Sequence, residues 1–137
     1  DLISKTLEYL RKRSGDKVVW KWNPPKKSLN IPMNSTLISW TLENIVKNGI
    51  DSIKGEGEIK IELINLKNLI RISISDNGVG IAENAIGKIF KPGYTTKKGG
   101  WGLGLSLSIR IVEEIHGGKL QVLNSSKELG TTLEISL

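Results

Sequence analysis

The stretch LIRISISDNGVGI at residues 69–81 decides the fold more than any other part of the chain. Its first half alternates isoleucine with polar residues, which predicts a β-strand with one buried face. Asp76 follows that strand, and Gly78 and Gly80 come directly after it. Glycine allows a sharp turn and a close approach of the backbone to a flat ligand, and the carboxylate can accept a hydrogen bond from an exocyclic amine. An ordinary Asp-Asn-Gly turn is the alternative interpretation.

Upstream, the pattern predicts a long helix from a capping residue at 34 or 35 to about residue 53. Asn44, Asn48 and Asp51 share one face of it, because steps of three and four residues return to nearly the same angle. Asparagine is a weak helix former, so two of them in mid-helix are unusual. They form either a solvated polar face or a row of amide oxygens lining a site, one of which could ligate a hard cation such as Mg²⁺. The apolar stripe expected to face the sheet is Ile38, Leu42, Ile45, Ile50 and Ile53.

Downstream, the stretch KKGGWGLGL at residues 97–105 opens another helix, predicted at about 103–115. Backbone N–H groups at a helix N-terminus form an anion site, and Lys97 and Lys98 add positive charge. The dinucleotide fingerprint does not fit because no strand precedes the glycines, and the phosphate loop of the Walker type lacks its Lys-Ser/Thr. A flexible linker is the alternative, but Leu103 and Leu105 argue against a solvated coil. The glycines therefore suggest a lid that becomes ordered on binding.

The remaining segments complete a two-layer α/β (α+β) arrangement with mixed strand directions. Val18 to Trp22 and residues 119–123 alternate as strands do, and Gly117-Gly118 supplies a helix stop before the latter. The other predicted elements are a helix at 2–13, a short paired segment at 29–31, strands at 59–64, 69–75 and 132–137, a turn at 65–68, and a short helix at 83–89.

The composition is that of one ordinary globular domain, with 137 residues, 38% of them hydrophobic and 25% charged. The absence of cysteine excludes disulfides, thiolate zinc sites and cysteine nucleophiles, and His116 is the only histidine. No apolar run approaches the ~20 residues of a membrane span. The net charge of +6 indicates an anionic partner. Nucleic acid, nucleotide phosphates and an acidic protein surface all fit, although the basic residues do not gather in one stripe.

The order of the motifs is more specific than any one of them. Asn44-x-x-x-Asn48, Asp76-x-Gly78-x-Gly80, IFKPGYTTK at 89–97 and GWGLGL at 100–105 follow one another. This arrangement resembles the catalytic ATP-binding domain of sensor histidine kinases, in the superfamily shared with DNA gyrase, heat-shock chaperones and MutL. The likeness covers the whole chain, so residues 1–137 are expected to be one such domain. It implies the Bergerat ATP-binding fold, a mixed five-stranded sheet packed on about three helices with a mobile ATP lid.

The resemblance also implies roles for individual residues. Asn48 would bind the Mg²⁺ that bridges the phosphates, Asn44 would assist, and both would be catalytic. Asp76 would bind the adenine amino group, with Gly78 and Gly80 giving the ring room. The lid would run from Phe90 to Gly100, and glycine-rich N–H groups after it would hold the phosphates. The full set of implied nucleotide-binding residues is Asn44, Asn48, Asp76, Gly78, Gly80, Ile81, Tyr94, Thr95, Thr96, Lys97, Lys98, Gly100, Gly102, Leu103, Gly104, Leu105 and Thr132, the last on a strand under the adenine pocket.

The helix motif also indicates which reaction a member of this superfamily catalyses, ATP hydrolysis or phosphoryl transfer. ATP-hydrolysing members place a glutamate one turn before the magnesium asparagine, and Asn44 at that position cannot act as a base. Glu43 points away from the slot, because adjacent helix residues lie ~100° apart. The resemblance therefore implies transfer of the γ-phosphate to a histidine, with slow hydrolysis. His116 ends a helix, where a partly charged imidazole would favour the helix dipole, and is not expected to be the phosphoacceptor.

We therefore expect a protein histidine kinase catalytic domain that uses ATP and Mg²⁺ in a two-component system. The acceptor histidine would lie on an upstream or separate dimerisation domain, and a response regulator would act downstream. The chain, which lacks an initiator methionine, reads as a piece of a longer protein. Alone it is expected to be a cytoplasmic monomer without membrane or nucleic-acid contacts, although the parent protein could be membrane-anchored. The alternatives are a catalytically silent nucleotide sensor of the same fold and a basic nucleic-acid-binding domain.

Overall fold

The computed structural model describes residues 2–26, 31–67, 69–93, 104–126 and 129–137. Within these residues, five strands form a single sheet in the order β1-β2-β3-β5-β4. β1 pairs with β2 in parallel, whereas the other neighbouring strands pair antiparallel. The expected mixed five-stranded sheet is therefore confirmed. The strands are β1 (Val18–Trp22), β2 (Gly57–Leu66), β3 (Leu69–Asp76), β4 (Lys119–Ser126) and β5 (Gly130–Ser136).

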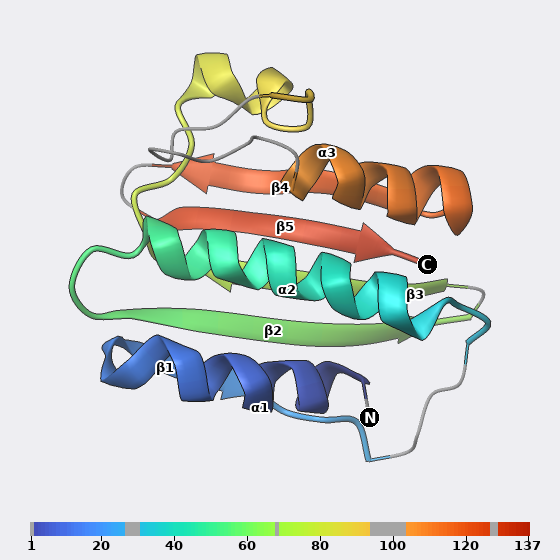
Figure 1. The fold of residues 1–137 in the computed structure, drawn as a ribbon, viewed down its shortest axis with the longest axis horizontal. Coiled ribbons are helices and arrows are strands. Elements are labelled where there is room, and N and C mark those ends of the chain that lie inside the picture. The colour runs from blue at the N-terminus through green and yellow to red at the C-terminus, as the bar shows by residue number, and fades with distance from the viewer. Residues whose placement is uncertain (1, 27–30, 68, 94–103, 127–128) are drawn as a thin grey trace.

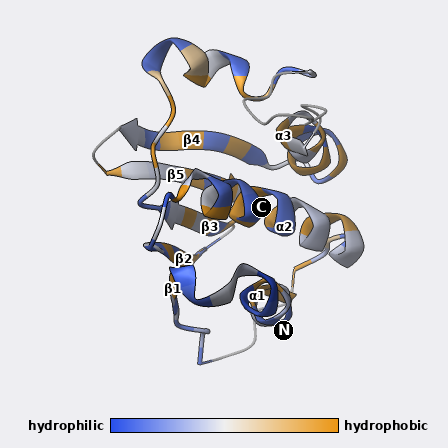
Figure 2. Cartoon of the chain, turned by 60° about the vertical axis from the view of Figure 1, so that its left-hand side comes forward, coloured by the Kyte–Doolittle hydropathy of each residue, from blue (hydrophilic) through white to orange (hydrophobic). Residues whose placement is uncertain are grey.

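The helices form a second layer on one face of this sheet, as Figure 1 shows. They are α1 (Leu2–Ser14), α2 (Ser35–Ser52) and α3 (Gly104–Ile109), and α3 continues into a π-helix at Arg110–Ile115. Short 3₁₀ helices occupy Gly15–Lys17 and Glu83–Lys88. Figure 2 shows hydrophobic segments alternating with hydrophilic ones along the helical ribbons, as expected of helices that cover a sheet with one face only. The two-layer α/β fold class is confirmed.

The core lies between α2 and the middle strands. Ile38 is 0% exposed and Ile45 is 2% exposed, and both pack in one cluster with the isoleucines of β2 and β3. Burial of each such side chain contributes about 1.5–3 kcal/mol, which outweighs the weak helix propensity of the asparagines on the other face of α2. The Asn34 side chain caps the helix by accepting a hydrogen bond from the Leu37 N–H at 3.0 Å. Both the predicted cap and the predicted stripe are confirmed, except that Ile50 is only half-buried.

Four strands are longer than the sequence predicts, most of all β2 and β4, and β5 begins two residues early at Gly130. β2 continues to Leu66, so the predicted turn at 65–68 is shorter than expected, because Asn65 pairs with Ile70. β4 continues through polar residues to Ser126, with an irregular register between Val122 and Asn124. A bulge of this kind breaks the alternation that reveals a strand in a sequence. The predicted pairing at 29–31 falls mostly outside the described residues.

His116 joins the end of the π-helix to the start of α2. Its Nδ1 lies 2.8 Å from the Ile111 carbonyl oxygen, and its Nε2 accepts a hydrogen bond from the Asn34 backbone N–H at 2.9 Å. The ring therefore caps one backbone carbonyl and one backbone N–H. The expected interaction of a partly charged imidazole with the helix dipole stays a prediction. No helix in the described part of the chain combines the length and hydrophobicity needed to cross a membrane.

Candidate functional site

Asp76 ends β3 and turns its side chain toward the C-terminal end of α2. Its Oδ1 accepts hydrogen bonds from the Gly78 backbone N–H at 2.9 Å and from the Ser52 hydroxyl at 3.1 Å. Burial raises the pKa of the Asp76 carboxyl above its ordinary value, while hydrogen bonds from Gly78, Ser52 and the Thr131 backbone N–H act in the opposite direction. A carboxylate that is partly desolvated, and whose donors in the described part of the chain are uncharged, is a candidate for ligand recognition.

The loop after Asp76 is fixed from two sides. On one side, the Val79 N–H donates to the Ser52 carbonyl oxygen at 3.0 Å. On the other side, the Ile81 N–H donates to the Ser125 hydroxyl of β4 at 2.7 Å. A β-carbon at Gly78 would lie 2.6 Å from the Ser52 carbonyl oxygen, so only glycine allows the loop to close against α2. Gly78 is thus explained by packing, and its predicted role of leaving room for a ring stays a prediction.

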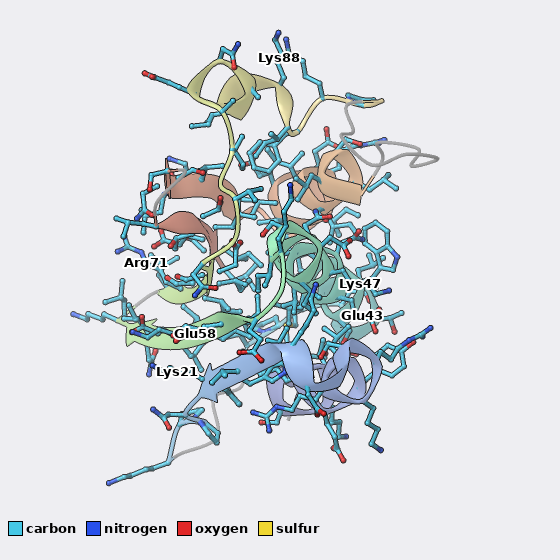
Figure 3. All side chains as sticks on the ribbon, turned by 90° about the vertical axis from the view of Figure 1, so that its left-hand side faces the viewer. Lys21, Glu43, Lys47, Glu58, Arg71 and Lys88 are labelled. Atoms are coloured by element: carbon cyan, nitrogen blue, oxygen red, sulfur yellow. The ribbon has the colours of Figure 1, made fainter. Side chains whose placement is uncertain are left out.

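The asparagine face of α2 meets the start of α3. Asn44 and Asn48 are both half-buried. A β-carbon at Gly104 would lie 2.5 Å from the Asn44 Oδ1, so the glycine lets the start of α3 approach this amide closely. In Figure 3, Glu43 and Lys47 lie on the helical side of the molecule, away from the sheet. The structure therefore brings the helix motif and the end of the glycine-rich motif together.

The register of β5 corrects one expectation. Thr132 pairs with Ser75, and their hydroxyl oxygens lie 2.9 Å apart. Because successive strand residues point to opposite faces, the Thr132 side chain lies on the face opposite to the Asp76 carboxylate. The residue paired with Asp76 is Thr131, whose hydroxyl oxygen is 2.8 Å from that of Ser125. Thr132 therefore lies on the predicted strand but does not face the predicted pocket, and Thr131 takes that position.

Two further neighbours of Asp76 were missed by the sequence analysis. Ser52 bonds its carboxylate, as described above. Gly49 is buried, and a β-carbon there would lie 3.4 Å from the Asp76 Oδ2 and 3.0 Å from the Ile59 Cδ1. Both residues lie on the turn of α2 that faces the end of β3. The signal that could have revealed them in the sequence is their small size.

The other predicted site residues divide into two groups. Gly80 and Ile81 are half-buried in the loop that follows Asp76, and Leu105 is half-buried and packs against the core. The lid and phosphate residues Tyr94, Thr95, Thr96, Lys97, Lys98, Gly100, Gly102 and Leu103 lie outside the described residues. A separate open hollow beside β1 is lined in part by Trp20, Trp22 and Lys60. It contains none of the motif residues, so the candidate site is the Asp76 region, where side chains and backbone donors from α2, β3 and β5 meet.

Comparison with known proteins assigns the chain to a family. A family model described as histidine kinase-, DNA gyrase B- and HSP90-like ATPase matches residues 33–137. The chain belongs to this family. Sporulation kinase B of Bacillus subtilis (strain 168) is 33% identical over 137 residues, which cover 99% of the chain and 32% of that protein. The catalytic domain of histidine kinase ThkA has 33% identity and a TM-score of 0.79, with 99% of this chain and 90% of that chain covered.

A second ThkA structure also matches the chain, over part of its own length. A structure of histidine kinase ThkA in complex with the response regulator protein TrrA matches with a TM-score of 0.80 and 28% identity, covering 99% of this chain and 39% of that chain. The fold is thus that of a histidine kinase catalytic domain, and the resemblance found in the sequence is confirmed. The chain spans about a third of the length of sporulation kinase B, since 32% of that protein is covered.

Proposed function

We propose that this domain binds MgATP and donates the γ-phosphate to a histidine on a dimerisation domain outside the chain, in two-component signalling. The observation that carries the proposal is the half-buried Asp76 carboxylate, fixed at the end of β3 by Ser52 and Gly78. Burying this charge is unfavourable without a ligand, because desolvation raises its pKa. An exocyclic amine of adenine would give the carboxylate a further donor, so binding offsets part of that cost.

The adenine end of the site would be formed by Asp76 together with the residues that surround it. Thr131 is buried and pairs with Asp76 across the sheet, and Ile81 is half-buried in the loop that follows. An apolar wall with one fixed acceptor is the usual form of a base-binding pocket. We therefore assign base recognition to Asp76, with Ile81 contributing apolar contact.

The phosphate end would lie along the asparagine face of α2. The amide oxygens of Asn44 and Asn48 suit a hard cation, and Mg²⁺ commonly takes few protein ligands, with phosphate and water oxygens as the others. The close approach of Gly104 to Asn44 leaves this amide beside the start of α3. The residues present therefore fit a nucleotide-bound magnesium ion, with Asn48 as its ligand. When bound, the ion would neutralise phosphate charge during transfer.

Transfer rather than hydrolysis is favoured by the absence of a base at Asn44. An amide cannot take a proton from water, and Glu43 lies on the outer side of the helical layer (Figure 3). The domain would act by positioning the γ-phosphate and stabilising its charge, which is how most phosphoryl transfer is catalysed. N–H groups from the predicted lid and the start of α3 would supply part of that stabilisation.

The phosphoacceptor would come from elsewhere in the parent protein. Both ring nitrogens of His116 are engaged with backbone groups, so this histidine has no nitrogen available to a phosphate. We propose a dimerisation domain as the phosphate acceptor and a response regulator downstream, by analogy with the ThkA complex. The isolated domain is proposed to be a monomer that works in the cytoplasm.

Transfer in trans tests this proposal. The chain would be mixed with γ-³²P-labelled MgATP and the separately purified dimerisation domain of the parent protein, and acid-labile, base-stable label on that domain would be measured. We expect label that depends on both components, that is strongly reduced in Asp76→Asn, and that is unchanged in Asp16→Asn, which alters an exposed aspartate outside the candidate site. Saturable MgATP binding without any transfer would instead favour the silent sensor. Indifference to ATP with steeply salt-dependent DNA binding would favour the nucleic-acid alternative.

A further inference from the structure

Ser52 ends α2 and holds an unusual position between two acceptors. Its hydroxyl oxygen lies 2.7 Å from the Gly49 carbonyl oxygen and 3.1 Å from the Asp76 Oδ1. A hydroxyl has one hydrogen, and an ionised carboxylate oxygen can only accept, so the contact with Asp76 is favourable only when that hydrogen is directed at least partly toward Oδ1. A serine that merely bonded its own helix would need no second acceptor.

The carboxylate of Asp76 is held by three donors. Oδ1 receives both the Ser52 hydroxyl and the Gly78 N–H, and the Thr131 backbone N–H also hydrogen-bonds the carboxylate. Oδ2 lies toward Gly49, where a β-carbon would be 3.4 Å away. With two donors on Oδ1, the carboxylate cannot rotate without breaking hydrogen bonds to the protein. Oδ2 is therefore the oxygen that lies beside Gly49 on α2.

We propose that Ser52 is a positioning residue for base recognition, whose hydroxyl fixes the Asp76 carboxylate so that Oδ2 is presented to the exocyclic amine of adenine. The identity of the base rests on the proposed function, whereas the fixing of the carboxylate concerns the nucleotide-free protein. Guanine carries an oxygen where adenine carries this amine, and a fixed carboxylate repels that oxygen. A carboxylate that is free to rotate or to bind a proton loses part of this discrimination.

Three variants and one control separate this role from a packing role. Ser52→Ala removes the donor, Ser52→Thr keeps a hydroxyl that can bond the same helix carbonyl, and Ser52→Cys keeps the volume with a weaker donor. Ser14→Ala is the matched control, because the Ser14 hydroxyl also donates to a carbonyl three residues earlier in its own helix, that of Arg11 in α1. The Asp76 carboxyl would be titrated by carbon-13 NMR in the nucleotide-free chain. MgATP and MgGTP affinities would be measured by calorimetry.

In Ser52→Ala we expect the NMR pKa of Asp76 to rise, MgATP to bind about tenfold more weakly, and the preference for ATP over GTP to shrink. Tenfold corresponds to the ~1.4 kcal/mol of one hydrogen bond. Ser52→Thr should have the wild-type Asp76 pKa, MgATP affinity and preference for ATP, and Ser52→Cys should give values between those of Ser52→Ala and the wild type. Ser14→Ala should match the wild type. An unchanged Asp76 titration in folded Ser52→Ala or Ser52→Cys would overturn the proposal. Failure of the wild type to bind any adenine nucleotide would overturn the proposed function alone, because the NMR titration still tests the positioning.

Discussion

Replacing Asp76 with asparagine should weaken nucleotide binding without lowering the stability of the fold. The amide oxygen of the introduced asparagine can still accept the hydrogen bonds from Ser52 and Gly78, while the cost of burying a charge disappears. Burial raises the pKa of Asp76, so the ionised form destabilises the fold at neutral pH. The contribution of the Asp76 carboxyl to stability is present in its protonated form, below the ordinary aspartate pKa. This contribution is lost as the pH rises through the raised pKa of the folded state. Asp76→Asn should therefore unfold at the wild-type temperature or above it, by about 3–5 °C per ~1 kcal/mol gained.

The same change should weaken nucleotide binding severely. A hydrogen bond to a charged group contributes about 1.5–3 kcal/mol, which corresponds to a loss of about 10- to 150-fold in MgATP affinity. An amide N–H turned toward the adenine amine would add to that loss. Calorimetric titration and thermal unfolding of Asp76→Asn would be compared with those of Asp16→Asn, an exposed carboxylate that should leave both unchanged. Wild-type affinity in Asp76→Asn, or a large drop in its unfolding temperature, would refute this reasoning.

Three further predictions concern the contacts of the site and of His116. MgATP affinity should fall as the pH is lowered, because Asp76 must be ionised to accept a hydrogen bond from adenine. Since burial raises the pKa of Asp76, this fall should begin at a higher pH than for an ordinary aspartate, and it should be missing in Asp76→Asn. Gly78→Ala should lower the free energy of unfolding by about 1–3 kcal/mol in urea titrations, because the added β-carbon would meet the Ser52 carbonyl oxygen. The control Gly87→Ala adds a β-carbon to open space and should lower the free energy of unfolding by under ~1 kcal/mol. His116→Ala should cost about 1–3 kcal/mol in the same titrations through the loss of two hydrogen bonds.

Each of these predictions has a result that contradicts it. A pH profile shared by the wild type and Asp76→Asn would mean that another group controls binding. Equal stability of Gly78→Ala and Gly87→Ala would mean that the loop has room to move away from α2. Wild-type stability in His116→Ala would mean that water replaces the imidazole at both backbone groups.

Much of the fold could be predicted because its signals are local. Alternating isoleucines mark β3, and the Asn34 cap and apolar stripe mark α2, since both depend on periodicity within one segment. The far half of β4 could not be predicted, because Asn124 to Ser126 are polar and follow a shift in register. Their pairing with β5 is a long-range contact that leaves no pattern in the chain. The contact of His116 with the start of α2 was missed for the same reason, since its partner Asn34 is distant in sequence.

Site residues that belong to a sequence motif could be predicted. Site residues whose position depends on strand pairing or helix packing could not. Asp76 stands at the end of a recognisable strand, so its position followed from the sequence. Thr131 and Thr132 are adjacent and identical, and only the pairing of β3 with β5 decides which of them faces Asp76. Ser52 and Gly49 carry no motif, because their importance arises from the packing of α2 against the end of β3.

The central claim, that an adenine nucleotide binds at the Asp76 region, is tested most directly by amide NMR. The wild-type chain would be titrated with a non-hydrolysable MgATP analogue while backbone shifts are followed residue by residue. We expect saturable changes at Gly49 and along residues 76–81, where α2 meets the end of β3, and at Gly104, where α3 meets Asn44 of α2. No saturable change, or changes confined to the hollow at Trp20 and Trp22, would contradict it.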